Sequence, residues 1–339
     1  MDETKMSRRG MVGAAAGAGM MVSAAAPAAA QPQSQSQPQA QAAGTAAPLP
    51  DPRSRYPRPP FQEQTQPFPG LAGRMNPRPD HGEESYKGSG RLAGRKALIT
   101  GGDSGMGRAA AIAYAREGAD VAISYLPDEE PDAREVIDLI QKAGRTALAL
   151  PGDIRDEAHC RRMVATTVER LGGLDILVNN AARQQQRQAL GDITSEDFDA
   201  TMRTNLYAMF WITKAALPHL RPGASIIQTT SEQAYDPSAN LVDYAMTKAA
   251  MMSFTKSLAK QLGPQGIRVN GVAPGPIWTP LQVSGGATME KLKAFGGDTP
   301  LGRPGQPVEL ASIYVQLAAA DASYANGQVY GAAGGSGQP

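Results

Sequence analysis

The feature that most constrains the fold is a short apolar segment that runs directly into a glycine-rich turn. Residues 96–100 (KALIT) have the pattern of a strand, residues 101–107 (GGDSGMG) follow at once, and residues 109–116 have the pattern of a helix. Glycines at this spacing allow backbone N–H groups to approach a pyrophosphate, whose charge the start of the helix then favours. The segment therefore predicts the first βα unit of a dinucleotide-binding domain.

Strand and helix patterns alternate after this turn. The predicted strands are 120–125, 146–150, 176–180, 225–230, 268–273 and 328–331, and the predicted helices include 133–143 and 157–171. Such alternation is typical of an α/β fold, here a Rossmann-type doubly wound parallel sheet with helices on both faces. We expect a single domain over residues 91–335, without an internal repeat.

The segments before residue 91 differ in composition from the rest of the chain. Residues 1–30 place Arg8 and Arg9 before a weakly apolar run that ends in three alanines, the order of a twin-arginine-like export signal. We expect export to the periplasm, with a cytoplasmic location as the alternative. The apolar run is short and rich in glycine, so we expect no stable membrane insertion.

Residues 31–90 are rich in Pro and Gln and carry little periodic apolar content. We expect a linker that continues into an N-terminal arm, because this segment cannot bury enough surface to fold alone. Aromatic and charged residues between 67 and 86 suit contact with the folded domain. His81 has no second histidine, cysteine or spaced carboxylate pair near it, so we expect a surface residue and no metal site.

Composition narrows the possible partners. The 33 basic residues nearly balance the 32 acidic ones, so no overall field attracts nucleic acid, and we expect none as a partner. The single cysteine, Cys160, cannot form an internal disulfide. A serine hydrolase would need a histidine near its nucleophile, and none of the three histidines lies in a suggestive motif.

Several short motifs occur in a fixed order along the predicted domain. They are TGxxxGxG at 100–107, NNAA at 179–182, Asn205, Ser231, YxxxK at 244–248 and PG at 274–275. In this order and spacing they resemble the short-chain dehydrogenase/reductase family over residues 91–335. The GGDSG turn at 101–105 and PIWTP at 276–280 further resemble a bacterial subgroup of NAD(P)-dependent aldehyde reductases or glucose-dehydrogenase-like enzymes.

The resemblance implies an NAD(P)(H)-dependent oxidoreductase that moves a hydride between the nicotinamide and a carbonyl or alcohol substrate. An aldehyde, ketone, sugar or polyol would qualify as this small-molecule substrate, and the sequence does not choose among them. The family also implies a homotetramer. A catalytically weak nucleotide-binding sensor or structural protein on the same fold is the alternative, and the intact catalytic positions favour the enzyme.

Four residues are expected to carry the chemistry. Tyr244 and Lys248 lie four positions apart in a predicted helix, so both project from one face, about one turn apart. The lysine charge and the positive nicotinamide ring would lower the pKa of the phenol. By resemblance, Tyr244 is the general acid/base, Ser231 holds the substrate oxygen, and Asn205 anchors a water that relays protons to Lys248.

The residues expected to contact the cofactor follow the ends of several strands. They are Gly101, Asp103, Ser104, Gly105, Met106, Gly107, Tyr125, Asp153, Ile154, Asn179, Tyr244, Lys248, Pro274, Gly275, Ile277 and Thr279. By resemblance, Asp153 contacts the adenine, Asn179 lines the adenosine side, and Thr279 meets the nicotinamide carboxamide. Residues 281–298, which contain two Gly-Gly pairs, are expected to form a mobile lid.

The second predicted strand bears on the choice between NADP and NAD. It ends in Ser124 and Tyr125 instead of the acid that repels a 2′-phosphate in NAD-selective relatives. We therefore expect NADP(H) to be used at least as well as NAD(H). Against this, an acidic run at 128–130 lies close behind, and no basic residue occupies positions 103, 104 or 126.

Overall fold

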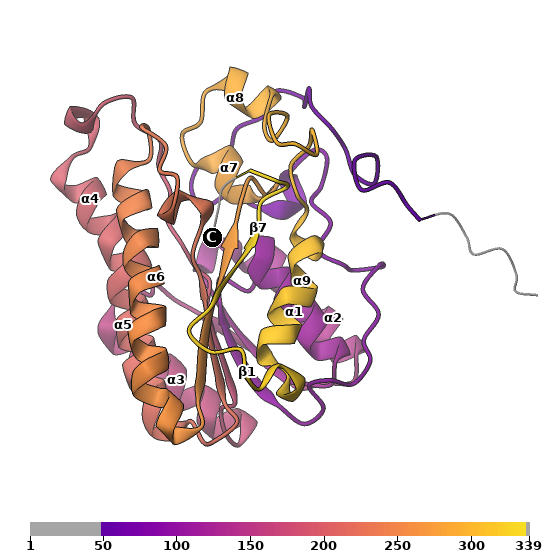
Figure 1. The fold of residues 1–339 in the computed structure, drawn as a ribbon, viewed down its shortest axis with the longest axis vertical. Helices are drawn as coiled ribbons and strands as arrows, with labels where there is room; N and C mark the ends of the chain where they lie inside the picture. Colours follow the sequence, from indigo (N-terminus) through magenta and orange to yellow (C-terminus); the bar gives the residue numbers. More distant parts are fainter. Residues whose placement is uncertain (1–48, 337–339) are drawn as a thin grey trace, which may run out of the picture. The chain divides into compact units, whose positions relative to one another are not determined.

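The computed structural model describes residues 49–336, and residues 50–336 lie within one compact unit. The expected export signal and the first part of the linker lie outside the described residues. Seven strands form one sheet in the order β3-β2-β1-β4-β5-β6-β7, and every neighbouring pair is parallel (Figure 1). The strands are β1 (Lys96–Thr100), β2 (Asp120–Tyr125), β3 (Ala147–Pro151), β4 (Ile176–Asn179), β5 (Ser225–Thr229), β6 (Arg268–Pro274) and β7 (Val329–Ala332).

Helices cover both faces of this sheet, as Figure 1 shows. One layer consists of α1 (Gly105–Arg116), α2 (Glu130–Lys142) and α9 (Pro307–Ala318). The other consists of α3 (Glu157–Leu171), α4 (Ser195–Met202), α5 (Ala208–Ala216) and α6 (Val242–Leu262). Two short helices, α7 (Pro280–Ser284) and α8 (Met289–Lys293), lie in the segment expected to be the lid. The predicted α/β Rossmann-type fold is confirmed, with helix α2 beginning three residues earlier than expected.

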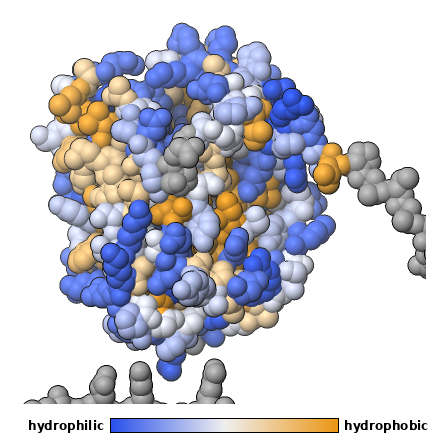
Figure 2. Space-filling view, viewed as in Figure 1, coloured by the Kyte–Doolittle hydropathy of each residue, from blue (hydrophilic) through white to orange (hydrophobic). Residues whose placement is uncertain are grey.

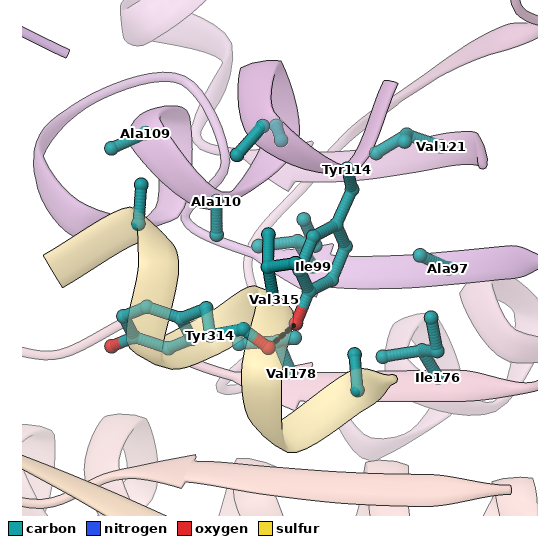
Figure 3. Packing of buried hydrophobic residues seen from close by; sticks show 14 of the residues in the cluster. Ala97, Ile99, Ala109, Ala110, Tyr114, Val121, Ile176, Val178, Tyr314 and Val315 are labelled. Atoms are coloured by element: carbon teal, nitrogen blue, oxygen red, sulfur yellow. Dashed lines mark hydrogen bonds between the residues drawn. The ribbon is translucent and has the colours of Figure 1, made fainter. Parts of the chain in front are cut away.

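The central strands are buried on both faces, although β5 and β6 carry polar residues such as Gln228 and Asn270. All residues of β4, β5 and β6 are buried, as expected for parallel strands covered on both faces. On the α1/α9 side the core depends on small residues: alanines such as Ala109 and Ala110 let the two helices approach closely. Figure 3 shows Tyr114 of α1 reaching α9, where its hydroxyl donates a hydrogen bond of 3.0 Å to the carbonyl oxygen of Tyr314.

The described part of the N-terminal arm lies against the domain. Near its C-terminal end, the Arg116 guanidinium donates hydrogen bonds to the carbonyl oxygens of Gly82, Glu83 and Tyr86. The Glu117 carboxylate accepts from the Tyr86 hydroxyl at 2.7 Å. Carbonyl groups that would otherwise need water are thereby satisfied by the side chains at the end of α1.

The expectation for His81 is wrong. Its side chain is completely buried, and its Nδ1 lies 3.0 Å from Glu83 Oε1. The same carboxylate pairs with Arg108, itself buried on α1, so a polar cluster fills this contact between the arm and the helix. Burial lowers the pKa of His81, which favours the neutral imidazole. The sequence indicated that residues 67–86 contact the domain, but not that His81 is buried in that contact.

No helix within residues 49–336 is both long and apolar enough to cross a bilayer.

Candidate active site

A cleft of about 1520 Å³ opens along the carboxyl ends of the strands. Strand order reverses between β1 and β4, which places this cleft where open α/β sheets bind ligands. The segments that follow all seven strands contribute to its walls. Residues far apart in the sequence thus lie around one site.

The glycine-rich turn forms one end of the cleft. Gly101 and Gly105 have φ angles of +61° and +53°, a region that favours glycine. Helix α1 begins at Gly105; Ser104 makes no capping bond through its side chain, and no acidic residue lies in the first turn. The N–H groups at this helix start therefore remain available for an anion, so the turn fits the pyrophosphate of a dinucleotide.

Most of the residues expected to contact the cofactor line this cleft. Those that do are Gly101, Asp103, Ser104, Gly105, Met106, Tyr125, Asp153, Ile154, Tyr244, Lys248, Pro274, Gly275, Ile277 and Thr279. Gly107 does not line it and acts within the turn: a Cβ there would come within 1.9 Å of the Gly101 carbonyl oxygen. The Asp153 carboxylate lies at the cleft and pairs with Arg155 at 2.6 Å.

Asn179 is the clearest departure from the expected set. Its side chain is buried and donates a 3.0 Å hydrogen bond to Thr213 on α5, away from the cleft. The next residue, Asn180, lines the cleft instead, and its amide donates to the carbonyl oxygens of Thr100 and Gly101 at 3.1 Å. Successive residues of a strand point to opposite faces, and this alternation sends the first asparagine into the helix layer and leaves the second at the turn.

Two carboxyl groups lie where β2 ends. The Gly102 N–H donates to the Ser124 carbonyl oxygen at 3.2 Å, which holds the turn that carries Asp103 against the end of β2. Asp103 is buried, and within the described structure its Oδ2 has no hydrogen-bond partner; Glu129 lines the same cleft. Burial raises the pKa of both groups, and nearby carboxyl groups add to the rise: Asp132 for Asp103, and both Asp103 and Asp132 for Glu129. Both groups therefore resist ionisation.

The expected catalytic residues gather at the centre of the cleft. Ser231 follows β5, and Tyr244 and Lys248 project from the first turns of α6 toward it; all three are buried and line the cleft. Lys248 Nζ lies 5.3 Å from the centre of the Tyr244 ring and donates a 2.7 Å hydrogen bond to the Thr229 carbonyl oxygen. The end of β5 thus fixes both the lysine and the serine.

Burial is the main cause of the pKa shifts of Tyr244 and Lys248. It raises the pKa of Tyr244 to about 12, against a smaller lowering by a hydrogen bond with Ser231, and it lowers the pKa of Lys248 to about 7. The sequence predicted a lowered tyrosine pKa, whereas the residues of this chain favour the neutral phenol. Both shifts have one cause: a charge is costly in a site closed off from water.

Asn205 lies beneath the cleft wall and does not line it. It falls in a π-helical turn, Arg203–Tyr207, between α4 and α5, an irregularity that is frequent at functional sites. Its side-chain amide donates to the Arg183 carbonyl oxygen and to Thr247 Oγ1, both at 3.0 Å, and its Oδ1 accepts from the Arg183 N–H. Asn205 therefore ties the segment after β4 to α6.

Two groups of cleft residues were missed by the sequence analysis. Glu232 follows Ser231 directly, and burial with the nearby charges of Asp236 and Asp298 raises its pKa to about 7. Its position next to Ser231 was the available signal. The arm also reaches the cleft, through Phe68 and neighbouring residues. Among residues 49–336, no group of three or more His, Cys, Asp or Glu side chains is placed to hold a metal ion.

Comparison with known proteins identifies relatives of the whole domain. A family model described as Enoyl-(Acyl carrier protein) reductase matches residues 101–336. The chain is 57% identical to the uncharacterized oxidoreductase YhxD of Bacillus subtilis over 81% of this chain and 93% of that protein. It is 54% identical to the uncharacterized oxidoreductase YghA of Escherichia coli, covering 84% and 97%. It is 43% identical to a glucose and ribitol dehydrogenase of Daucus carota, covering 82% and 96%.

Solved structures of dehydrogenases and reductases also resemble this chain. A short chain dehydrogenase from Burkholderia cenocepacia in complex with NADP superposes with a TM-score of 0.68 at 36% identity, covering 72% of this chain and 98% of that one. A 3-ketoacyl-(acyl-carrier-protein) reductase from Brucella melitensis complexed with NADH superposes with a TM-score of 0.65 at 31% identity, covering 72% and 98%. Structural neighbours thus bind either nicotinamide cofactor.

Proposed function

The chain belongs to the short-chain dehydrogenase/reductase family of oxidoreductases, and from this premise we propose that it transfers a hydride between NAD(P)(H) and a carbonyl or alcohol, with Tyr244 as the general acid/base. The observation that carries the proposal is the shared cleft: the glycine turn at one end and the group of Ser231, Tyr244 and Lys248 at its centre. Cofactor and substrate would therefore meet at a buried proton donor.

The residues that would hold the cofactor are those of the cleft. The start of α1 suits the pyrophosphate, the ends of β2 and β3 suit the adenosine, and the segment after β6, with Thr279, suits the nicotinamide. Bound NAD(P)(H) supplies the hydride donor or acceptor.

The side chains of this protein would manage the proton. In reduction, the Tyr244 hydroxyl donates its proton to the substrate oxygen as that oxygen gains negative charge, while the Ser231 hydroxyl donates a hydrogen bond to the same oxygen. A tyrosine pKa of about 12 keeps the phenol protonated and ready for this step. In oxidation, the Lys248 ammonium favours the phenolate that must accept the proton of the alcohol.

We further propose an uncharged, hydroxyl-bearing substrate such as a sugar or polyol, or the corresponding small aldehyde or ketone. Carboxyl groups of Glu232, Asp236 and Asp298 line the cleft beside Ser231, and carboxylates hydrogen-bond hydroxyl groups while repelling anions. The name of the carrot relative, glucose and ribitol dehydrogenase, points in the same direction.

The test is turnover measured by absorbance of the reduced nicotinamide, with a panel of aldehydes, ketones, sugars and polyols and a matched set of anionic carbonyl compounds. We expect turnover with at least one uncharged class and little with the anions. Measurable cofactor binding with no turnover across the panel would contradict the proposal and favour the sensor or structural alternative.

A homotetramer is also proposed. Phe198 of α4, Phe210 of α5 and Met246 of α6 are 40%, 49% and 52% exposed, and Figure 2 shows apolar side chains gathered over the side of the molecule where α4 and α6 lie. Exposed apolar surface of this kind is typical of an interface. Light scattering on the purified protein gives the answer: a mass of about four chains is expected, and a monomer would contradict it.

Export is proposed as well, on the basis of Arg8, Arg9 and the apolar run that follows them.

A further inference from the structure

We propose that residues 59–70 of the N-terminal arm form a fixed wall of the substrate cleft and hold the lid, residues 281–298, in the position seen in this structure, so that the arm helps to select the substrate. This inference rests on the proposed function, because a wall selects substrates only in an enzyme that has them. Its structural part, the restraint of the lid, can be measured without any substrate.

The arm contributes directly to the surface of the cleft. Pro59, Pro60, Phe68, Pro69 and Gly70 line the same cavity as Ser231 and Tyr244. The Phe68 side chain is 50% exposed although it is large and apolar, and a half-exposed aromatic ring on a cleft wall is suited to contact a bound molecule. The segment was expected to lie along the domain, and the structure takes it to the substrate end.

An aromatic stack joins the arm to the segment that precedes the lid. The ring of Phe61 lies parallel to the indole of Trp278, with centroids 4.3 Å apart and an interplanar angle of 18°. The Trp278 ring also packs near the Phe295 ring of the lid, with centroids 5.9 Å apart and planes tilted by 48°. Phe61 and Trp278 are both buried, together with Val283 and Leu292 of the lid, so these residues form a small apolar core separate from the two that flank the sheet.

Two backbone hydrogen bonds also join the arm to the lid. The Phe61 N–H donates to the Lys293 carbonyl oxygen and the Gln66 N–H donates to the Val283 carbonyl oxygen, both at 2.9 Å. Lys293 and Val283 lie in α8 and α7, the two short helices of the lid. The arm is therefore bonded to both helices, and opening of the lid would require both contacts to break.

The arm is itself anchored on the far side of these contacts. The Ala72 N–H donates a 2.5 Å hydrogen bond to the Asp132 carboxylate of α2. The Trp278 indole N–H donates to the Pro77 carbonyl oxygen at 2.8 Å, and the Arg303 guanidinium donates to the Pro52 carbonyl oxygen at 2.8 Å. A segment held at both ends against the domain is a wall, whereas a free tail would leave the lid unrestrained.

The first experiment measures the lid by limited trypsin digestion of the full chain. Lys291 and Lys293 are exposed trypsin sites on α8, and the carbonyl oxygen of Lys293 accepts the Phe61 N–H. In Phe61→Ala we expect cleavage at these two sites to be at least about tenfold faster, because loss of the stack frees the lid for local opening. The control is Tyr324→Ala, which removes a fully exposed aromatic ring outside the cleft.

An unchanged cleavage rate in Phe61→Ala, at conditions where its circular dichroism matches wild type, would overturn the proposal. If Phe61→Ala does not fold, Phe61→Leu is used in its place. Leucine keeps an apolar side chain but cannot stack on the indole, so tryptic cleavage should again be faster than in wild type, by a smaller factor.

The second experiment measures selection, with the best substrate from the panel. Phe68→Ala should raise KM at least about fivefold, with kcat and the cofactor Kd within about twofold of wild type, because an apolar ring on the wall can contribute to binding but takes no part in proton transfer. Equal KM values in Phe68→Ala, Tyr324→Ala and wild type would overturn the selective role. Absence of turnover in wild type would instead contradict the proposed function, while the trypsin result still decides whether the arm restrains the lid.

Discussion

Lys248 Nζ lies 5.3 Å from the centre of the Tyr244 ring, one turn further along α6. The two side chains have opposite pKa shifts from one cause, since burial raises the pKa of the phenol to about 12 and lowers the pKa of the ammonium to about 7. Paired groups whose surroundings move their pKa values in this way are characteristic of acid–base chemistry. The geometry thus places a proton donor, Tyr244, beside a lysine whose charge affects the pKa of the phenol.

The close packing of the glycine turn gives a prediction about stability. A Cβ at Gly107 would come within 1.9 Å of the Gly101 carbonyl oxygen, and neither backbone segment can move away easily. Gly107→Ala is expected to lower Tm by at least about 5 °C and to weaken cofactor binding. Gly191→Ala is the matched control, because a Cβ at Gly191 meets nothing within 4 Å. Equal melting temperatures of the two variants would show that the turn tolerates a side chain.

The sequence predicted the sheet and the central group of the site well, for physical reasons. A turn such as residues 101–107 requires glycine at fixed positions, and a pair such as Tyr244 and Lys248 requires only helical spacing. Both signals are local. Asn179 was expected to line the adenosine side, but its side chain bonds to Thr213, because neighbouring residues of a strand point to opposite faces.

The arm could not be placed from sequence for a different reason. Its contacts range from about 30 positions apart, such as Tyr86 with Glu117, to more than 200, such as Phe61 with Trp278 and Pro77 with the same indole. Proline-rich composition indicates only that the segment does not fold alone. Whether it docks depends on a surface formed elsewhere in the chain, which is also why His81 was expected at the surface.

Cofactor choice is the next prediction. The missing acid at the end of β2 predicts use of NADP(H) at least as well as NAD(H), while Asp103 and Glu129 place carboxyl groups at the same end of the cleft. Glu129→Gln removes one of them and is expected to raise the affinity for NADPH relative to NADH by about fivefold above about pH 9, where the Glu129 carboxyl is ionised. Fluorescence titration of both cofactors measures this ratio. A wild-type preference for NAD of a hundredfold or more would contradict the expectation for NADP.

Glu232 predicts how stability depends on pH. Its pKa in the folded protein, about 7, lies above its ordinary value of 4.5, so the folded state binds the proton more tightly than the unfolded state. Its contribution to stability is therefore present below about pH 4.5 and is lost as pH rises through about 7. Glu232→Gln should be more stable than wild type at about pH 8, with the advantage declining toward pH 4.5.

Differential scanning calorimetry across this pH range measures the difference in Tm. The control is Glu169→Gln, which changes an exposed carboxylate on α3 and should leave the difference flat. A Glu232→Gln difference that is equally flat would show that this carboxyl has no raised pKa in the folded protein.

The proposed export signal predicts that Arg8→Lys together with Arg9→Lys blocks translocation. Cells producing the full chain should contain a shortened, periplasmic form, and the double variant should remain full-length in the cytoplasm. The chain has one cysteine, so folding before export needs no disulfide. Identical fractionation of both proteins, with no shortened form, would contradict export by this route.

The central claim is that Tyr244 moves the proton, and single-turnover absorbance of the Tyr244→Phe variant tests it most directly. Phenylalanine keeps the ring in its buried position and deletes only the hydroxyl, so the rate of hydride transfer should fall by roughly 10²- to 10⁴-fold while the cofactor Kd stays within about twofold. Lys248→Ala, in contrast, should lower the rate of hydride transfer and also raise the cofactor Kd, because by resemblance the ammonium also binds the nicotinamide ribose. A Tyr244→Phe enzyme that keeps more than about a tenth of the wild-type rate would contradict the account.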